Sequence, residues 1–215
     1  MTPDATMSLE EALAQAAGFA GGGQGRTILG IAGAPGVGKS TVAEEIQAHV
    51  GPRCRVVPMD GFHLAQDELV RLGRAERKGA IDTFDVAGYV ALLRRLRDPQ
   101  EGTVYAPRFD RLIDEPIGSA IAVEPDVELV VTEGNYLLAD EGGWSGVAPL
   151  LDHCWFVAAP EQRRLRQLAA RHEEHGKTPE AAYAWALGTD QRNAELVERT
   201  RHRADAIVLL PCEQT

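Results

Sequence analysis

Two patterns of apolar and polar positions alternate along the chain. Short apolar segments, typical of strands buried in a parallel sheet, occur at residues 27–32, 55–59, 127–132, 152–157 and 205–210. Apolar residues at helical spacing predict helices at residues 8–17, 42–50, 84–97, 161–171 and 179–199. Two shorter strands, on either side of an irregular loop, are expected at residues 104–106 and 117–123. Strands that alternate with helices predict an α/β fold with a mainly parallel sheet.

The N-terminal segment has its own composition. Ser8 precedes the first predicted helix and Glu11 follows three residues later, which is the sequence pattern of a capping box. Glycines dominate residues 18–25, which predicts a flexible connector. We therefore expect an N-terminal helix and connector over residues 1–25, followed by a single domain over residues 26–210.

A glycine-rich segment between a predicted strand and a predicted helix matches the pattern G-x-x-x-x-G-K-[ST]. Its residues are Gly33, Ala34, Pro35, Gly36, Val37, Gly38, Lys39, Ser40 and Thr41. Strand, glycine loop and helix together indicate a phosphate-binding P-loop, in which backbone N–H groups and the helix N-terminus face phosphate oxygens. Lys39 would reach the outer phosphates of a nucleoside triphosphate, and the Ser40 hydroxyl would bind Mg²⁺. The alternative is a glycine turn that matches by chance.

Composition narrows the range of partners. The chain has 22 Lys and Arg against 32 Asp and Glu, a formal net charge of −10, which disfavours general binding of nucleic acid or anionic membranes. Three cysteines without a C-x-x-C pair predict reduced thiols rather than disulfides or a zinc site. The first residues lack a basic secretory pattern, and no apolar run approaches the roughly 20 residues that cross a bilayer. We therefore expect a cytoplasmic protein.

Two acidic residues stand where predicted strands end. Asp60 follows the strand at 55–59, and Glu133 follows the strand at 127–132. Ligands of parallel sheets bind beyond the carboxyl ends of the strands, and P-loop enzymes use an acid beside Mg²⁺. Glu133 suits that metal-side role and Asp60 suits a base for an acceptor hydroxyl, although the two roles can be exchanged. The alternative for each residue is a solvated acid at a strand end.

The predicted helix at residues 161–171 is rich in arginine. Arg164 and Arg171 are seven residues apart and therefore share one face of the helix. Such a face can close over transferring phosphates as a lid, which we expect at about residues 161–178. The alternative is a solvated basic helix.

Several separate motifs resemble those of the phosphoribulokinase, uridine kinase and type I pantothenate kinase group. Besides the P-loop they are Met59-Asp60-Gly61-Phe62-His63, Lys78-Gly79 with Thr83-Phe84-Asp85, Glu133-Gly134-Asn135-Tyr136, and the C-terminal Asn193, Thr200-Arg201 and Arg203-Ala204. The similarity extends from about Arg26 to Leu210. Within the group it is greatest to the bacterial branch of nucleoside/nucleotide kinases, also described as fructose-transport-system kinases.

This resemblance implies a P-loop NTPase fold, which is a three-layer sandwich with a mainly parallel sheet and a helical lid. It also implies transfer of the γ-phosphate of ATP, with Mg²⁺, to a hydroxyl of a small molecule. In the pattern of the group, Asp60 is the catalytic base, Glu133 lies at the metal, and Arg164 and Arg171 fall at the spacing of lid arginines. We count Lys39 with Asp60 and these two arginines as the expected catalytic residues. Relatives in this group often form homodimers.

The acceptor site is less closely defined by the sequence. The residues that we assign to it are His63, Lys78, Tyr105, Arg108, Asn135 and Asn193. His63 can bond an acceptor hydroxyl or cap the next helix, Lys78 can contact an anionic acceptor or form a local ion pair, and Asn193 can be an ordinary amide on a helix surface. Nucleosides, sugars and pantothenate-like acids all fit such a pocket.

A second class of function is a nucleotide-dependent switch or assembly ATPase without a small-molecule acceptor. A GTP switch needs the guanine-reading pattern N-K-x-D, and the chain contains no such match. An acidic chain of 215 residues also offers little surface for large partners. ATP turnover that rises with a small hydroxyl compound would favour the kinase over the switch.

Overall fold

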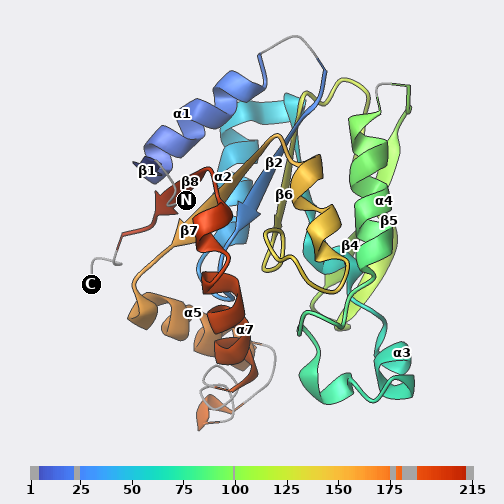
Figure 1. Cartoon of the computed structure of the whole chain (residues 1–215), viewed down its shortest axis with the longest axis vertical. Coiled ribbons are helices and arrows are strands. Elements are labelled where there is room, and N and C mark those ends of the chain that lie inside the picture. The colour runs from blue at the N-terminus through green and yellow to red at the C-terminus, as the bar shows by residue number, and fades with distance from the viewer. Residues whose placement is uncertain (1–4, 22–24, 99, 175–177, 181–187, 212–215) are drawn as a thin grey trace.

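A six-stranded parallel sheet forms the centre of the protein (Figure 1). The computed structural model describes residues 5–21, 25–98, 100–174, 178–180 and 188–211. In sheet order the strands are β1 (Ala5–Met7), β8 (Ala206–Leu209), β7 (His153–Ala158), β2 (Thr27–Ala32), β6 (Leu129–Gly134) and β3 (Cys54–Pro58). A separate antiparallel hairpin consists of β4 (Val104–Asp110) and β5 (Glu115–Val123). The predicted α/β fold with a mainly parallel sheet is confirmed.

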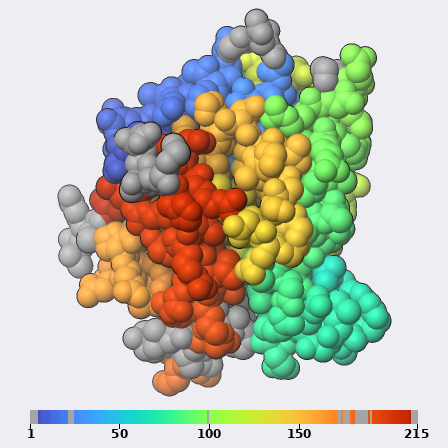
Figure 2. Space-filling model, in the orientation of Figure 1, coloured from blue at the N-terminus to red at the C-terminus, as the bar shows by residue number. Residues whose placement is uncertain are grey.

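Helices cover both faces of this sheet (Figure 1). They are α1 (Leu9–Phe19), α2 (Lys39–Val50), α3 (Gln66–Arg71), α4 (Val86–Arg97), α5 (Glu161–Glu174) and α7 (Thr189–Glu198). The strands point toward the end of the molecule at which α3, α5 and α7 lie (Figure 1). Figure 2 shows these three segments, in teal, orange and red, at the same end of the surface. The layers thus leave one end of the sheet for ligands.

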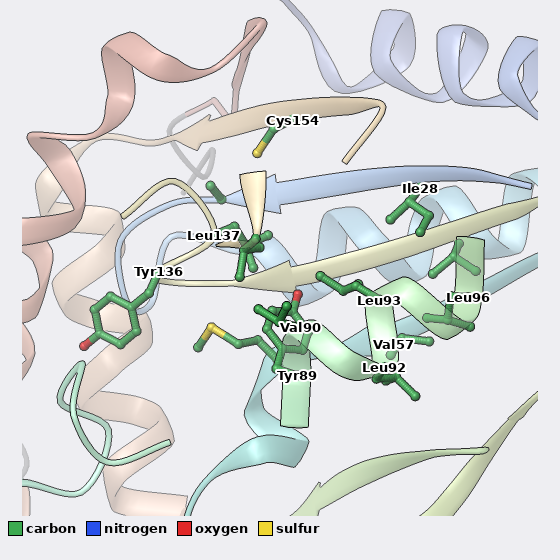
Figure 3. Close-up of a cluster of buried hydrophobic side chains, with 14 of the residues drawn as sticks. Ile28, Val57, Tyr89, Val90, Leu92, Leu93, Leu96, Tyr136, Leu137 and Cys154 are labelled. Carbon is green, nitrogen blue, oxygen red and sulfur yellow. The ribbon is translucent and has the colours of Figure 1, made fainter. Parts of the chain in front are cut away.

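Side chains of the central strands alternate between two cores. In β2, Ile28 packs in the core that contains α4 and the β4–β5 hairpin, whereas its neighbour Leu29 packs in the core that contains α1 and α2. Figure 3 shows Tyr89, Leu93 and Leu96 of α4 in the first of these cores. Because both faces of the sheet are covered, the central strands are nearly continuous in apolar residues, as the sequence pattern indicated.

The predicted capping box starts α1. The Ser8 hydroxyl accepts a hydrogen bond from the Glu11 N–H at 3.2 Å, and the Ser8 N–H donates to the Glu11 carboxylate at 2.7 Å. Ala12 and Ala16 of this helix are fully buried in the same core as α2. The helix is therefore packed onto the sheet, while residues 22–24 of the connector lie outside the described part of the chain. The proposed domain limits remain a prediction.

The structure differs from the sequence expectations in four elements. β1 was missed because three residues at a sheet edge show no periodicity, and the short α3 was also missed. The irregular loop expected after residue 106 is wrong, because β4 continues to Asp110 by pairing with β5 across a register shift between Ala106 and Arg108. A continuous helix over residues 179–199 is also wrong. Gly188 has φ −95° and ψ −97°, which is not helical, and α7 begins after it.

The described cysteines are reduced and buried. Cys54 and Cys154 form no disulfide, and burial raises the pKa of the Cys54 thiol to about 12. Burial also raises the pKa of Cys154, whereas Cys212 lies outside the described residues. Among the helices that the structure describes, none is long and apolar enough to span a membrane.

Candidate active site

Three adjacent strands bring the predicted phosphate-binding and acidic residues to one edge of the sheet. Glu133 of β6 pairs in register with Ile31 of β2 on one side and with Pro58 of β3 on the other. β2 leads directly into the P-loop, and β3 leads into the 3-10 turn Met59–Phe62, which carries Asp60. The expected convergence of these strand ends is therefore present.

A cavity of about 740 Å³ opens at this edge of the sheet. The predicted site residues that line it are Pro35, Gly36, Gly38, Lys39, Ser40, Thr41, Asp60, His63, Lys78, Glu133, Asn135 and Asn193. Gly33, Ala34 and Val37 belong to the P-loop but do not line the cavity. The Ala34 and Val37 side chains are buried, so these two residues contribute backbone and packing to the loop.

The P-loop keeps a conformation that requires glycine. Gly36 has φ +76°, and a Cβ atom there would lie 2.4 Å from Leu168 Cγ and 2.9 Å from the carbonyl oxygen of Arg164. The loop thus passes closely under α5. α2 begins at Lys39 with Gly38 as N-cap and no side-chain cap, so its first N–H groups are available to an anion.

The Lys39 ammonium group is buried and hydrogen-bonded. Lys39 is 7% exposed, and its Nζ donates to the Ala34 carbonyl oxygen at 3.0 Å and to Asn135 Oδ1 at 2.8 Å. The second of these bonds joins the P-loop to the end of β6. A phosphate oxygen at the loop would replace one neutral acceptor of this lysine with a charged one.

Ser40 and Glu133 face each other across the loop. The Ser40 hydroxyl donates to Glu133 Oε1 at 3.0 Å, and Glu133 is only 6% exposed. Burial is the main cause that raises the pKa of Glu133, and Asp60 adds to it, while Lys39 and the Ser40 hydrogen bond oppose it. A hydroxyl beside a carboxylate is an oxygen donor set that fits Mg²⁺, whose further ligands in such sites are water and phosphate oxygens. Among the described residues, no group of three or more His, Cys, Asp and Glu side chains could hold a metal ion by itself.

Asp60 lines the same cavity and contacts a cation. Arg111 Nη2, from the turn between β4 and β5, is 3.3 Å from Asp60 Oδ2. His63 Nδ1 donates to the Asp60 carbonyl oxygen at 2.7 Å, so a neutral His63 keeps Nε2 as a hydrogen-bond acceptor. Burial is the main cause that lowers the pKa of His63, which favours this neutral form. His63 does not cap α3, whose N-cap is Ala65.

Several known proteins are similar to this chain over most of its length. No family model matches the chain. A Schizosaccharomyces pombe protein named "Putative uridine kinase C227.14" is 32% identical over 196 residues, which cover 86% of this chain and 83% of the relative. This chain belongs to the P-loop kinases of the phosphoribulokinase, uridine kinase and type I pantothenate kinase group. A Leifsonia xyli pantothenate kinase is 32% identical over 191 residues, 84% of this kinase but 57% of the relative.

A solved structure shows the same fold over nearly the whole length. It is described as a "putative fructose transport system kinase from Silicibacter sp. TM1040" and aligns with a TM-score of 0.83 and 35% identity. The alignment covers 94% of this kinase and 98% of that chain. The predicted group and three-layer P-loop kinase fold are thereby confirmed.

Two predicted acceptor residues of the kinase do not reach the cavity. Tyr105 is 54% exposed and Arg108 has 58% of its side chain exposed; neither lines the cavity. Arg108 instead lies 3.9 Å from Asp110. The segment is a strand rather than a loop, with a register shift between Ala106 and Arg108 that separates Tyr105 from the part of the strand near the cavity. Beyond the shift the side chains alternate, so Phe109 lines the cavity together with the turn residue Arg111, and Arg108 does not.

The structure describes the side chain of only one of the two predicted lid arginines. Arg164 is 6% exposed and does not line the cavity; its Nη2 donates to Gln191 Oε1 of α7, and it lies 3.8 Å from Glu161. Its Nη1 is buried and has no hydrogen-bond partner in the described structure. The backbone of Arg171 belongs to α5, but its side chain lies outside the described residues. The part played by both arginines in a lid remains a prediction.

The remaining acceptor candidates converge on the segment around Gly79. The Gly79 carbonyl oxygen accepts hydrogen bonds from Tyr136 Oη at 2.7 Å and Asn193 Nδ2 at 3.3 Å. Asn193 thus connects α7 to the acceptor side of the cavity. Residues that line this cavity and were not assigned to the site from the sequence are Gln66, Ala75, Gly79, Phe84, Phe109, Arg111, Leu112, Asp114, Gln167 and Asp190. Of these, Gly79 and Phe84 stand within motifs on which the resemblance rests.

Proposed function

We propose that this kinase transfers the γ-phosphoryl group of ATP to a hydroxyl group of a small molecule. The observation that supports it best is the placement of two acids with different partners in one cavity. Glu133 is bonded to Ser40 of the P-loop, and Asp60 lies on the turn after β3 beside the acceptor-side residues. These positions suit a metal-side acid and a base.

Different residues of the chain have different roles in the proposed transfer. P-loop N–H groups and Lys39 hold the phosphates and balance their charge. Ser40 and Glu133 would hold Mg²⁺, which supplies charge neutralisation on the phosphate oxygens. Asp60 accepts the proton of the acceptor hydroxyl as its oxygen bonds to the γ-phosphorus, while the bond from that phosphorus to the β–γ bridging oxygen breaks and ADP leaves.

The two acids can be distinguished by their Mg²⁺ dependence. Asp60→Asn keeps the shape of the side chain but removes the proton acceptor, so transfer should fall by a factor on the order of 10²–10⁴ with little change in Mg²⁺ requirement. Glu133→Gln should instead raise the Mg²⁺ concentration needed for half-maximal rate. Asp67→Asn, on the exposed side of α3, is a matched control and should behave like wild type.

Two outcomes would count against this assignment. Rescue of Asp60→Asn by excess Mg²⁺ would show that the two acids have exchanged roles. ATP turnover that no small hydroxyl compound accelerates would instead indicate a switch or assembly ATPase.

A further inference from the structure

The acceptor end of the cavity contains two cations, and each is held by a carboxylate of the protein. Lys78 pairs with Asp114, and Arg111 pairs with Asp60. We propose that the acceptor of this kinase is an anionic hydroxyl compound, a hydroxy acid or a phosphorylated polyol, whose acid group replaces Asp114 on Lys78. The inference rests on the proposed kinase function and specifies its substrate class.

Lys78 is built into the cavity wall as a nearly buried cation. Its side chain is 12% exposed, and its Nζ lies 5.4 Å from the centre of the Phe109 ring. The Nζ donates to Asp114 Oδ2 at 2.9 Å, to the Asp114 carbonyl oxygen, and to Gln66 Oε1 at 3.4 Å. A cation with so little exposure requires an anionic partner, because burial of an unpaired charge is costly.

The anionic partner of Lys78 is the more easily displaced member of the pair. Asp114 has 69% of its side chain exposed and a left-handed backbone, φ +55°, which is strained for a residue other than glycine. It lies at the tip of the β4–β5 turn, where Leu112 is 96% and Ile113 60% exposed. If Asp114 leaves, its carboxylate enters water at little cost, whereas Lys78 needs a new anion. A carboxylate or phosphate on the acceptor provides that anion, and a neutral acceptor does not.

The same turn connects acid recognition to the proposed base. It carries Arg111 as well as Asp114, so two ion pairs hold it over the acceptor end, one to Lys78 and one to Asp60. Loss of the Asp114 pair removes one of these two attachments and allows Arg111 to move from Asp60. An anionic acceptor thereby makes the base available for its own hydroxyl.

The substrate class can be tested with matched acids and neutral compounds. Transfer of label from [γ-³³P]ATP would be measured with glycerate and glycerol, pantothenate and pantothenol, and fructose 6-phosphate and fructose. The same assay would be run on a cell metabolite extract divided by an anion exchanger into retained and unretained fractions. We expect a labelled product from an acid member or from the retained fraction, and the carboxylate and phosphate pairs distinguish the two sources of the anion.

The other outcomes of this assay distinguish a failure of the anionic acceptor from a failure of the kinase function. A product formed only from the unretained fraction, or a neutral member with a kcat/KM equal to that of its acid, would overturn the anionic acceptor and leave the kinase function intact. No labelled product from any compound or fraction would overturn the kinase function itself.

Variants of the Lys78–Asp114 pair test whether Lys78 binds the acid group of the acceptor. Lys78→Met should raise the KM for the acid acceptor by roughly 10- to 100-fold, since a charge-assisted hydrogen bond is lost, and Lys78→Arg should restore part of it. Asp114→Asn should lower that KM several-fold because it removes the internal competitor. Arg71→Met, at an exposed ion pair on α3, is the matched control and should leave the KM unchanged. Melting curves would establish that each variant is folded, and an unchanged KM in folded Lys78→Met would overturn the assignment.

Discussion

Gly61 is next to the proposed base Asp60, and one carbon added there should lower both the stability of the protein and its rate. A Cβ atom at Gly61 would lie 2.4 Å from the carbonyl oxygen of Pro107 and 2.7 Å from its carbonyl carbon. Both atoms belong to the backbone of β4, so neither can rotate away. Since ordinary contact begins at 3.4 Å, Gly61→Ala should force the Met59–Phe62 turn and β4 about 1 Å apart.

The size of both effects follows from this displacement. Overpacking of this kind costs about 1–3 kcal/mol of unfolding free energy, which for a chain of this length lowers the melting temperature by roughly 2–12 °C. Asp60 is the preceding residue and should move with the turn. A misplacement of about 1 Å at a reacting group can reduce kcat on the order of 10²-fold. The rate loss should therefore persist at 25 °C, where the variant is still folded.

The assay compares melting curves and initial rates of label transfer. Gly118→Ala in β5 is the matched control, because no atom lies within 4 Å of its added Cβ and its φ is not left-handed. That variant should keep the wild-type rate and melting temperature, or gain slightly in stability. Wild-type melting and kcat in Gly61→Ala would refute the close contact with β4. A lower melting temperature with an unchanged kcat would refute only the link between this contact and the position of Asp60.

Two further predictions concern the phosphate end of the cavity. Lys39→Ala should abolish turnover and shrink the rise in melting temperature that Mg·ATP causes, while the ligand-free variant stays folded; wild-type turnover would refute the P-loop assignment. Burial and Asp60 raise the pKa of Glu133 above its ordinary 4.5, so the folded chain binds this proton more tightly than the unfolded chain does. Ligand-free protein should therefore lose unfolding free energy as pH rises from about 4.5 through the raised value, as urea titrations at several pH values would show. Glu133→Gln should lack this component, and an identical pH dependence in that variant would contradict the assignment.

The phosphate end was predictable because its chemistry is local in the sequence. Nine consecutive residues define the P-loop, and the strand before it and the helix after it are recognisable from their apolar patterns. Asp60 and Glu133 were also predictable, because parallel strands end at the same edge of a sheet. To predict that these two residues lie close together, only the approximate ends of the strands are needed, and the apolar segments of the sequence indicate them.

The acceptor end depends on details that apolar patterns do not contain. The register shift between Ala106 and Arg108 decides which side chains of β4 face the cavity. Pro107 stands at the shift and is a residue type found at bulges, but it does not specify which side chains then face the cavity. Lys78 and Asp114 are 36 positions apart, so their ion pair follows from how the hairpin folds back. For Arg164, helical spacing specified a face but not its neighbour, which is Gln191 of α7.

The two ends of the cavity therefore differ in how they meet a ligand. At the phosphate end, two buried charged groups have less buried partners: Lys39 bonds Asn135, and Glu133 accepts a hydrogen bond from Ser40. Since an unsatisfied buried polar group costs about 1–3 kcal/mol, these bonds keep the loop in shape without nucleotide, and phosphate and metal can replace them one for one. At the acceptor end, an exposed turn supplies Asp114, whose carboxylate can enter water at little cost once another anion takes its place on Lys78. In the proposed function the P-loop side of the cavity is therefore fixed, and the β4–β5 turn that carries Asp114 decides which acceptor is used.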